Sequence, residues 1–249
     1  MEEEALLKKR FLDLSRQADY KGIVTFTDFL NLNELNIFHQ TSTLLATGYE
    51  INGGYELAER QMVAFLPDAL YYEWSYPFVC IQIAPAYPKF QDTLNHRDIL
   101  GALMNLGILR SKIGDIILKD NIAYVFCAES VSSYLAESLE KVKHTIVKSA
   151  VVDAFNLSVT PNFEATGGIV TSNRLDAIVA CITKVSRSNA SAMIANGKVF
   201  INGKETLHNT YVCKQKDILS IRSYGKYIFD EISGETKKGR LKISYRKYV

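Results

Sequence analysis

The sequence lacks the features that mark membrane proteins, metalloproteins and the common classes of enzyme. No apolar run approaches the ~18–20 residues that span a bilayer, and no apolar segment near the start indicates a secretory signal. The cysteines lie far apart without a Cys-x-x-Cys pair, and the histidines show no metal-ligand spacing. A P-loop, a Gly-x-Ser-x-Gly motif and a glycine-rich cofactor turn are also missing. We therefore expect a cytoplasmic protein with reduced, mostly buried cysteines, no metal and no cofactor.

Charge is distributed unevenly along an otherwise ordinary globular composition. The 249 residues are 47% hydrophobic and 22% charged, which is typical of one to three soluble domains. Residues 1–160 contain 14 basic and 20 acidic side chains, a net charge of −6, whereas residues 161–249 contain 15 and 7, a net charge of +8. This asymmetry indicates a polyanion-binding module joined to an acidic body.

The basic part contains a pattern that predicts two short helices and a β-hairpin. Ser172 or Asn173 is placed to cap a first helix, and Ser186 is placed to cap a second one that ends at Gly197. The apolar run Val199–Ile201 then leads into Asn202-Gly203, which is a strong hairpin signal.

This stretch resembles the S-four RNA-binding domain, which is named after a protein of the small ribosomal subunit. The resemblance covers about residues 171–223, and it is carried by Arg174-Leu175-Asp176, Ser186-Arg187-Ser188, Ala190, Ile194, Gly197-Lys198-Val199, Asn202-Gly203 and Asp217-Ile218. S-four domains read the shape of RNA at helical junctions, so the resemblance implies RNA and not DNA as the ligand.

The candidate RNA-binding residues follow from this pattern and from the needs of phosphate binding. Lys and Arg neutralise phosphates, and the free N–H groups at a helix start favour an anion. We expect the RNA-binding side chains to be Arg174, Arg187, Ser188, Asn189, Lys198, Asn202, Lys204, Lys237, Lys238 and Arg240. Asp176 is expected to be a local cap or a partner for Arg174.

The chain as a whole is expected to be an α+β protein with three folded parts. We predict an N-terminal α/β subdomain (1–75), a ferredoxin-like, RRM-like domain of βαββαβ order (76–155), a linker (156–170) and the S-four-type domain of helix–helix–β-hairpin form (171–249). Helices are predicted over 2–20, within 26–45, and over 97–106 and 131–142. Strands are predicted over 44–51, 61–66, 78–84, 115–119, 122–127, 144–149, 211–213, 218–222, 227–232 and 241–245.

Two aromatic side chains of the central part could have either of two roles. Tyr124 and Phe126 lie two residues apart on one predicted strand and therefore share a face. They would stack bases in an RNA-recognition motif or pack in the core. We favour the core, because the basic residues that accompany such a strand in RNA-recognition motifs are missing.

The segment before these strands resembles the central part of bacterial YlmH-type proteins, which have an S-four domain at the C-terminus. The resemblance is carried by residues 94–108, Arg110 and Ile113-Gly114-Asp115. His96-Arg97-Asp98 is not a kinase loop, because Leu103 stands where that loop needs Asn. Asn95 is instead placed to cap a helix, with Asp98 in its first turn.

Together the two resemblances imply a bacterial, ribosome-associated RNA-binding protein without chemistry of its own. The resemblance implies that it binds structured RNA (rRNA or tRNA) on the large ribosomal subunit, in translation quality control. The alternative is an RNA-modifying enzyme, a pseudouridine synthase or a methyltransferase, that uses the S-four-type domain for targeting. In that case Asn173-Arg174-Leu175-Asp176 would be compared with the catalytic string of the synthases, although an apolar helix follows it.

Overall fold

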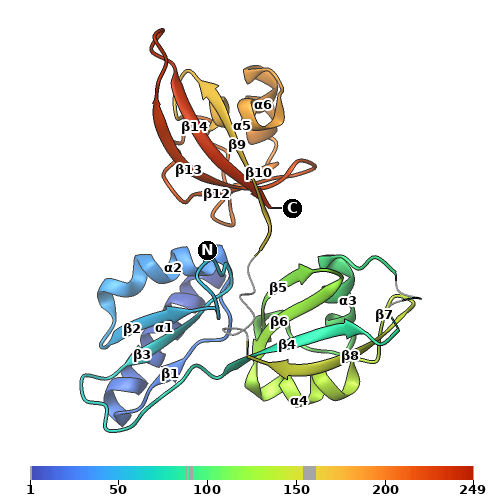
Figure 1. The fold of residues 1–249 in the computed structure, drawn as a ribbon. Helices are drawn as coiled ribbons and strands as arrows, with labels where there is room; N and C mark the ends of the chain where they lie inside the picture. The colour runs from blue at the N-terminus through green and yellow to red at the C-terminus, as the bar shows by residue number, and fades with distance from the viewer. Residues whose placement is uncertain (1, 88, 90–91, 154–160, 249) are drawn as a thin grey trace. The chain divides into compact units, whose positions relative to one another are not determined.

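The computed structural model describes residues 2–87, 89, 92–153 and 161–248. The chain divides into two compact units, residues 1–160 and residues 161–249 (Figure 1). Helices and antiparallel sheets occur in both units, so the α+β class is confirmed. None of the helices in the described ranges is long and apolar enough to cross a membrane.

The first unit begins with a small sheet covered by two helices. Its elements are α1 (Glu2–Lys21), β1 (Thr25–Phe26), α2 (Leu32–Thr41), the 3-10 helix η1 (Ser42–Leu44), β2 (Gly48–Asn52) and β3 (Met62–Leu66), with strand order β1-β3-β2. A capping box between Asn31 and Glu34 starts α2. The rings of Phe11 and Phe38 pack edge to face, with centroids 5.3 Å apart, in the core under the helices.

The rest of the first unit has the element order strand–helix–strand–strand–helix–strand, with one short strand added. The elements are β4 (Phe78–Pro85), α3 (His96–Asn105), the 3-10 helix η3 (Arg110–Lys112), β5 (Ile113–Lys119), β6 (Ile122–Ala128), α4 (Glu129–Ser138), β7 (Lys141–Val142) and β8 (Thr145–Val152). The sheet order is β5-β6-β4-β8-β7, with every pair antiparallel. Asn95 caps α3 and Asp98 lies in its first turn, as predicted, and the two also form a capping box.

The face of this sheet that contains Tyr124 and Phe126 is covered by N-terminal residues. Phe126 is 1% exposed and Tyr124 is 8% exposed, and both lie in one apolar cluster with Phe29 and Met62. The ring of Tyr55 stacks on Phe126 at a centroid distance of 5.5 Å. The predicted core position of the two aromatics is therefore confirmed.

A polar cluster joins the same two parts of the first unit. Asp115 accepts hydrogen bonds from the hydroxyl of Tyr55 (2.7 Å) and from the backbone N–H groups of Glu59 and Arg60. The guanidinium of Arg60 donates to the backbone carbonyls of Ile113 and Phe29 at 2.8 and 2.9 Å. Burial raises the pKa of Asp115 despite these hydrogen bonds. Keeping the carboxylate ionised therefore costs desolvation free energy, which the hydrogen bonds from Tyr55, Glu59 and Arg60 offset only in part.

The second unit is a single six-stranded sheet with two helices. Its elements are β9 (Phe163–Val170), α5 (Leu175–Thr183), α6 (Arg187–Ala195), β10 (Val199–Ile201), β11 (Lys204–Glu205), β12 (Ile218–Ile221), β13 (Gly225–Glu235) and β14 (Leu241–Tyr248), in the order β11-β10-β12-β13-β14-β9. The buried residues of α5 and α6, including Ile178 and Ile194, form one core with Phe229 and Tyr245 of the sheet. The predicted hairpin turn at Asn202-Gly203 is present, with both residues at positive φ.

The predicted linker is the largest difference between sequence and structure. Residues 163–170 of the proposed 156–170 linker form β9, which pairs with β14 along its whole length, and residues 154–160 lie outside the described ranges. The second unit therefore begins at Pro161 and not at Thr171. The Gly, Thr and Ser content suggested a loop, but an edge strand with a mostly exposed face needs little apolar alternation.

Four shorter predictions are also corrected. Residues 26–30 are not helical, because the backbone N–H groups of Thr27 and Leu30 bond to carbonyls of Val63 and Gln61. The helix predicted over 131–142 ends at Ser138, since the chain turns back at Lys143 to pair β7 with β8. Residues 42–44 form η1, and residues 211–213 contribute one isolated bridge at Val212 in place of a strand.

Candidate nucleic-acid interface

Two arginines of the second unit converge on one carboxylate at the start of α5. Arg187 donates from Nε to Oδ2 of Asp176 at 2.9 Å and from Nη2 to Oδ1 at 3.1 Å. Arg174, the N-cap residue of α5, donates to the same two oxygens at 3.3 and 3.2 Å. The predicted pairing of Asp176 with Arg174 is present, and Arg187 adds a second guanidinium that the sequence spacing did not indicate.

The cluster has a net positive charge and an exposed outer side. Asp176 is only 3% exposed, whereas the side chains of Arg174 and Arg187 are 39% and 47% exposed. Burial alone would raise the pKa of Asp176, but the hydrogen bonds and charges of Arg187 and Arg174 outweigh it, so the pKa lies below its usual range. The ionised carboxylate therefore holds the planar guanidinium groups of Arg174 and Arg187 in fixed orientations at the surface. Fixed, planar guanidiniums are suited to binding phosphate.

The start of α6 adds free backbone donors next to Arg187. Ser186 is the N-cap, as predicted, and its Oγ accepts from the backbone N–H of Asn189 at 3.2 Å. The first N–H groups of an α-helix have no intrahelical partner, and Arg187 and Ser188, which supply them here, are both exposed. The hydroxyl of Ser188 lies 2.9 Å from that of Ser186. This helix end is therefore available to an anion.

The start of α5 is occupied by the chain itself. The backbone N–H of Leu175 donates to the backbone carbonyl of Tyr211 at 2.8 Å, and the backbone N–H of Asp176 donates to the backbone carbonyl of Asn209 at 3.2 Å. The loop after β11 thus satisfies the donors of α5, so of the two helix starts only that of α6 can offer backbone N–H groups to a ligand.

The candidate residues of the β10–β11 hairpin have two different roles, two being exposed cations and one an asparagine that is hydrogen-bonded within the fold. Lys198 and Lys204 are exposed on either side of β10. Asn202 has a different role: its Nδ2 donates to Asp217 at 2.9 Å and its Oδ1 accepts from the N–H of Ile218 at 2.8 Å. Asn202 therefore positions the turn, and its amide is engaged within the fold.

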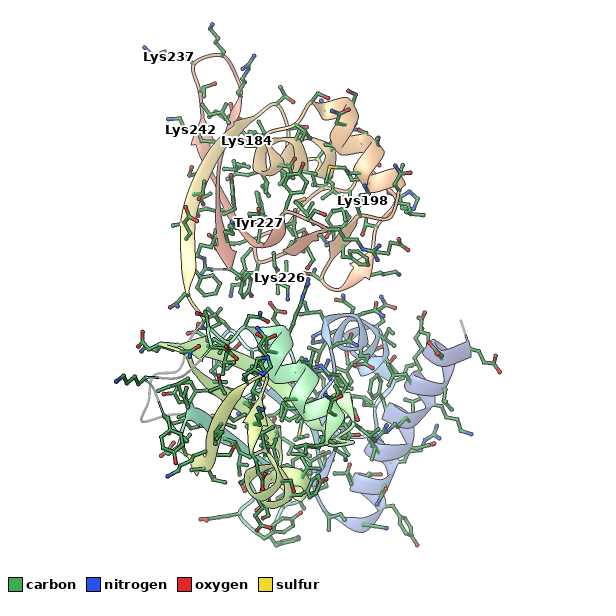
Figure 2. The ribbon with its side chains drawn as sticks, turned by 90° about the vertical axis from the view of Figure 1, so that its right-hand side faces the viewer. Lys184, Lys198, Lys226, Tyr227, Lys237 and Lys242 are labelled. Atoms are coloured by element: carbon green, nitrogen blue, oxygen red, sulfur yellow. The ribbon has the colours of Figure 1, made fainter. Side chains whose placement is uncertain are left out.

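The remaining candidates lie at the tip of the long β13–β14 hairpin. Lys237, Lys238 and Arg240 are all exposed there. Because β10 and β13 are both antiparallel to β12, they run in the same direction, and their C-terminal turns point to the same end of the sheet. Figure 2 shows Lys237 at the far end of the hairpin and Lys198 beside the start of β10. Ile201 at the end of β10 lies level with Tyr227, ten residues before Lys237, so the hairpin tip extends well beyond the turn after β10. The candidate set therefore forms two basic regions and not one cluster.

Sequence reasoning missed one cation that the fold places between the two helices. Lys184 is the C-cap of α5, with φ of +58°, and is exposed immediately before the start of α6. A left-handed lysine at a helix end has no strong sequence signal, because glycine or asparagine usually occupies that position. Lys184 therefore adds an exposed cation in the connection between α5 and α6.

Comparison with known proteins agrees with the sequence resemblance. Residues 75–155 match the family model described as "Putative RNA-binding domain in YlmH". The chain is 28% identical over 246 residues to the "Ribosome-associated protein quality control protein P2" of Bacillus subtilis (strain 168). The aligned residues cover 98% of this chain and 93% of that relative. The resemblance to YlmH-type proteins is confirmed.

A solved structure supports the same relationship at the level of the fold. The "Cell division protein ylmH from Streptococcus pneumoniae" superposes with a TM-score of 0.50 at 18% identity, covering 62% of this chain and 93% of that one. At this identity the match shows a shared fold over that part of the chain and no more.

Proposed function

We propose that this protein binds structured RNA, rRNA or tRNA, in association with the ribosome, and takes part in translation quality control without catalysing a reaction. The observation that carries the proposal is the pair of guanidiniums that Asp176 holds next to the exposed start of α6. In this proposal residues 171–249 act as the S-four-type module, extended by β9, and the protein is cytoplasmic. The likeness to a ribosome-associated quality control protein over almost the whole chain supports it.

The central RRM-like domain is proposed to contribute to RNA binding as well. Its match to an RNA-binding family model supports this role. Tyr124 and Phe126 are buried beneath Phe29 and Tyr55, so they are not available to stack bases. Any RNA contact of this domain therefore uses other residues.

The alternative of an RNA-modifying enzyme is less well supported by the geometry of Asp176. A catalytic aspartate has to reach the base on which it acts, whereas this carboxylate is 3% exposed and accepts from two guanidiniums and from the N–H of Ala177. Its position fits a residue that orients Arg174 and Arg187. We propose the large subunit as the site of association on the family resemblance alone.

The test measures binding of the full chain to an rRNA-derived stem–loop as a function of salt. Each lost phosphate contact reduces the log–log salt slope by ~0.7–0.9. We expect Lys198→Gln and Arg187→Lys to weaken binding, with the slope falling by about one for Lys198→Gln, because Lys198 is exposed and its removal leaves the Asp176 cluster intact. The matched control is Arg16→Gln on α1, an exposed arginine of the acidic unit.

Two results would contradict the proposal. One is equal affinity of wild type, Lys198→Gln and Arg187→Lys for the stem–loop at every salt concentration. The other comes from purification of the tagged chain out of bacterial cells: recovery without ribosomal particles or tRNA would oppose ribosome association. A mass shift in bulk RNA after incubation with the protein would favour the enzyme alternative.

A further inference from the structure

The sheet of the second unit has a second face that none of the candidate residues uses. In the described part of this unit both helices pack on the face that contains Gly168, Phe229 and Tyr245; a Cβ at Gly168 would collide with Cys181 of α5. Side chains alternate along a strand, so the neighbours of these residues point to the opposite face. We call this opposite face the outer face.

One row of residues crosses the outer face from β10 to β9. The register pairs Phe200 with Ser220, Ser220 with Lys226, and Tyr248 with Phe163. Lys226 and Tyr248 connect the two halves of the row. They lie opposite each other because the adjacent residues Tyr227 and Lys247 are a register pair of β13 and β14. The Nζ of Lys226 lies 5.5 Å from the ring centroid of Tyr248. The row extends over four interstrand spacings, about 19 Å.

Each aromatic ring in this row has a cation over one of its faces. The guanidinium carbon of Arg222 lies 5.2 Å from the ring centroid of Phe200, and that of Arg246 lies 5.0 Å from that of Phe163. The rings of Phe163 and Tyr248 are themselves in contact, with centroids 4.8 Å apart and planes inclined at 60°. Three aromatic–cation pairs therefore lie along one line, all of them partly or fully accessible.

One of the three pairs has an evident role in stabilising the fold. Arg246 also forms hydrogen bonds of 2.8–3.1 Å with Asp230, so it is fixed as part of the sheet. Arg222 is exposed and follows the end of β12, and the Phe200 ring beneath it is half-buried. In Figure 2, Tyr227 lies in the interior of the unit, while Lys226, the residue before it, projects to the surface.

Accessible aromatic rings accompanied by cations match the chemistry of single-stranded nucleic acid. Any base can stack on an exposed aromatic ring, and each phosphate between two bases needs a positive neighbour. The second unit as a whole has a net charge of +8, which complements a polyanion and opposes a cationic partner.

We propose that the outer face binds a single-stranded RNA segment. Arg222 and Lys226 move off the rings that they cover and reach phosphates, bases stack on the rings of Phe200 and Tyr248, and Phe163 borders the bound segment. The site lies on the opposite side of the sheet from the Asp176 cluster and accepts a different form of RNA. It therefore goes beyond the proposed function, and either one can fail without the other.

The experiment uses the full chain and a fluorescein-labelled ten-nucleotide oligouridylate. We expect Phe200→Leu and Tyr248→Leu, which keep apolar volume but remove the ring, each to weaken binding about fivefold or more. Tyr248→Phe keeps the ring and should stay within about twofold of wild type. Lys226→Gln should weaken binding, whereas Lys247→Gln, on the same sheet but the other face, should not.

Two comparisons make the outcome decisive. An abasic ribose-phosphate oligomer of equal length should bind much more weakly, because it has nothing to stack. The affinity of the Leu variants for the rRNA stem–loop should be unchanged. Equal binding of abasic and uridine oligomers, or no effect of either Leu variant, would overturn the proposal and leave the face to a protein partner.

A third measurement does not depend on the folding of any variant. Oligouridylate that contains 4-thiouridine is crosslinked by near-ultraviolet light to the wild-type chain, and the labelled peptides are mapped. Crosslinks on peptides with Phe163, Phe200 or Tyr248 are expected. Crosslinks confined to the first unit or to α5 and α6 would refute the assignment.

Discussion

Arg187 and Asp176, eleven residues apart in sequence, are joined by two parallel hydrogen bonds of 2.9 and 3.1 Å across the starts of two helices. The guanidinium of Arg187 remains half exposed while the carboxylate of Asp176 is buried, so the pair connects the packed interior of the second unit to its surface. Asp176 thereby has two functions: it ties α6 to α5, and it holds the fork of Arg187 in one orientation.

Replacing Asp176 by Asn should destabilise the second unit by about 1–2 kcal/mol. The amide accepts with one oxygen only, and the two guanidiniums lose their counter-charge; solvent around the exposed forks reduces the cost. Far-UV circular dichroism during urea unfolding should show the loss. Fluorescence of Trp74, the single tryptophan, reports on the first unit and should show an unchanged transition. A shift of the Trp74 transition would contradict this assignment.

The contribution of Asp176 should disappear in acid. Its folded-state pKa is lowered because the arginine interactions outweigh the effect of burial, so the stabilisation is complete above the unfolded-state pKa of about 3.9. It is lost as the pH falls through the lower folded-state value. The stability difference between wild type and Asp176→Asn should therefore be constant from pH 5 to 7 and shrink below about pH 4. A difference that grows in acid would exclude this explanation.

Sequence patterns predicted most of the helix caps and tight turns but missed structure that forms by strand pairing or helix packing. One cap was wrong: the N-cap of α5 is Arg174, without a side-chain cap, and not Ser172 or Asn173. Ser186, Asn95 and Asn202-Gly203 were placed correctly, because caps and tight turns depend on a few adjacent residues. Strand β9 was missed, because its Gly167 and Gly168 carry no apolar alternation and it forms only by pairing with β14. Arg187 reached Asp176 through the packing of two helices, which no spacing rule within one helix describes.

The approach of Gly54 to Phe126 gives a sharp test of how the N-terminal part covers the central sheet. Gly54 has φ of +96°, and a Cβ there would collide with the Phe126 ring. Gly54→Ala should destabilise the first unit by about 2 kcal/mol or more through strain and overpacking. Gly101→Ala is the matched control: it lies within α3 with open space around it and should stabilise by about 0.5–1 kcal/mol. Trp74 fluorescence in urea measures both; equal effects of the two substitutions would contradict the packing.

The cysteines should differ in reactivity towards iodoacetamide in the native protein. Burial raises the pKa of Cys80, Cys127 and Cys213 to about 12, whereas Cys181 is partly accessible. At pH 8 we expect Cys181 to be alkylated first, with all four modified after unfolding in urea, as read by peptide mass spectrometry. Unfolded thiols ionise near ~8.5 while the buried ones stay protonated, so stability should fall as the pH rises above that value. Rapid native alkylation of Cys80 would contradict its burial.

Charge at the tip of the β13–β14 hairpin should affect RNA binding without affecting stability. Lys237, Lys238 and Arg240 are exposed, and the turn is closed by bonds that do not involve their side chains: the N–H of Thr236 to the carbonyl of Arg240 at 2.7 Å, and the N–H groups of Gly239 and Arg240 to Thr236. Replacing all three cations by Gln should leave the unfolding curve unchanged. The log–log salt slope for the stem–loop should fall by about two, since each phosphate contact contributes ~0.7–0.9.

The matched control for the tip removes the same charge from the acidic unit. Lys8, Lys9 and Arg16 lie on α1, and their replacement by Gln alters the total charge equally. If the tip inserts among phosphates, its variant should lose far more affinity than the α1 variant at the same salt, because contact and not total charge sets the slope. Equal losses would mean that the hairpin acts only through long-range attraction, and the three residues would then leave the set of RNA contacts.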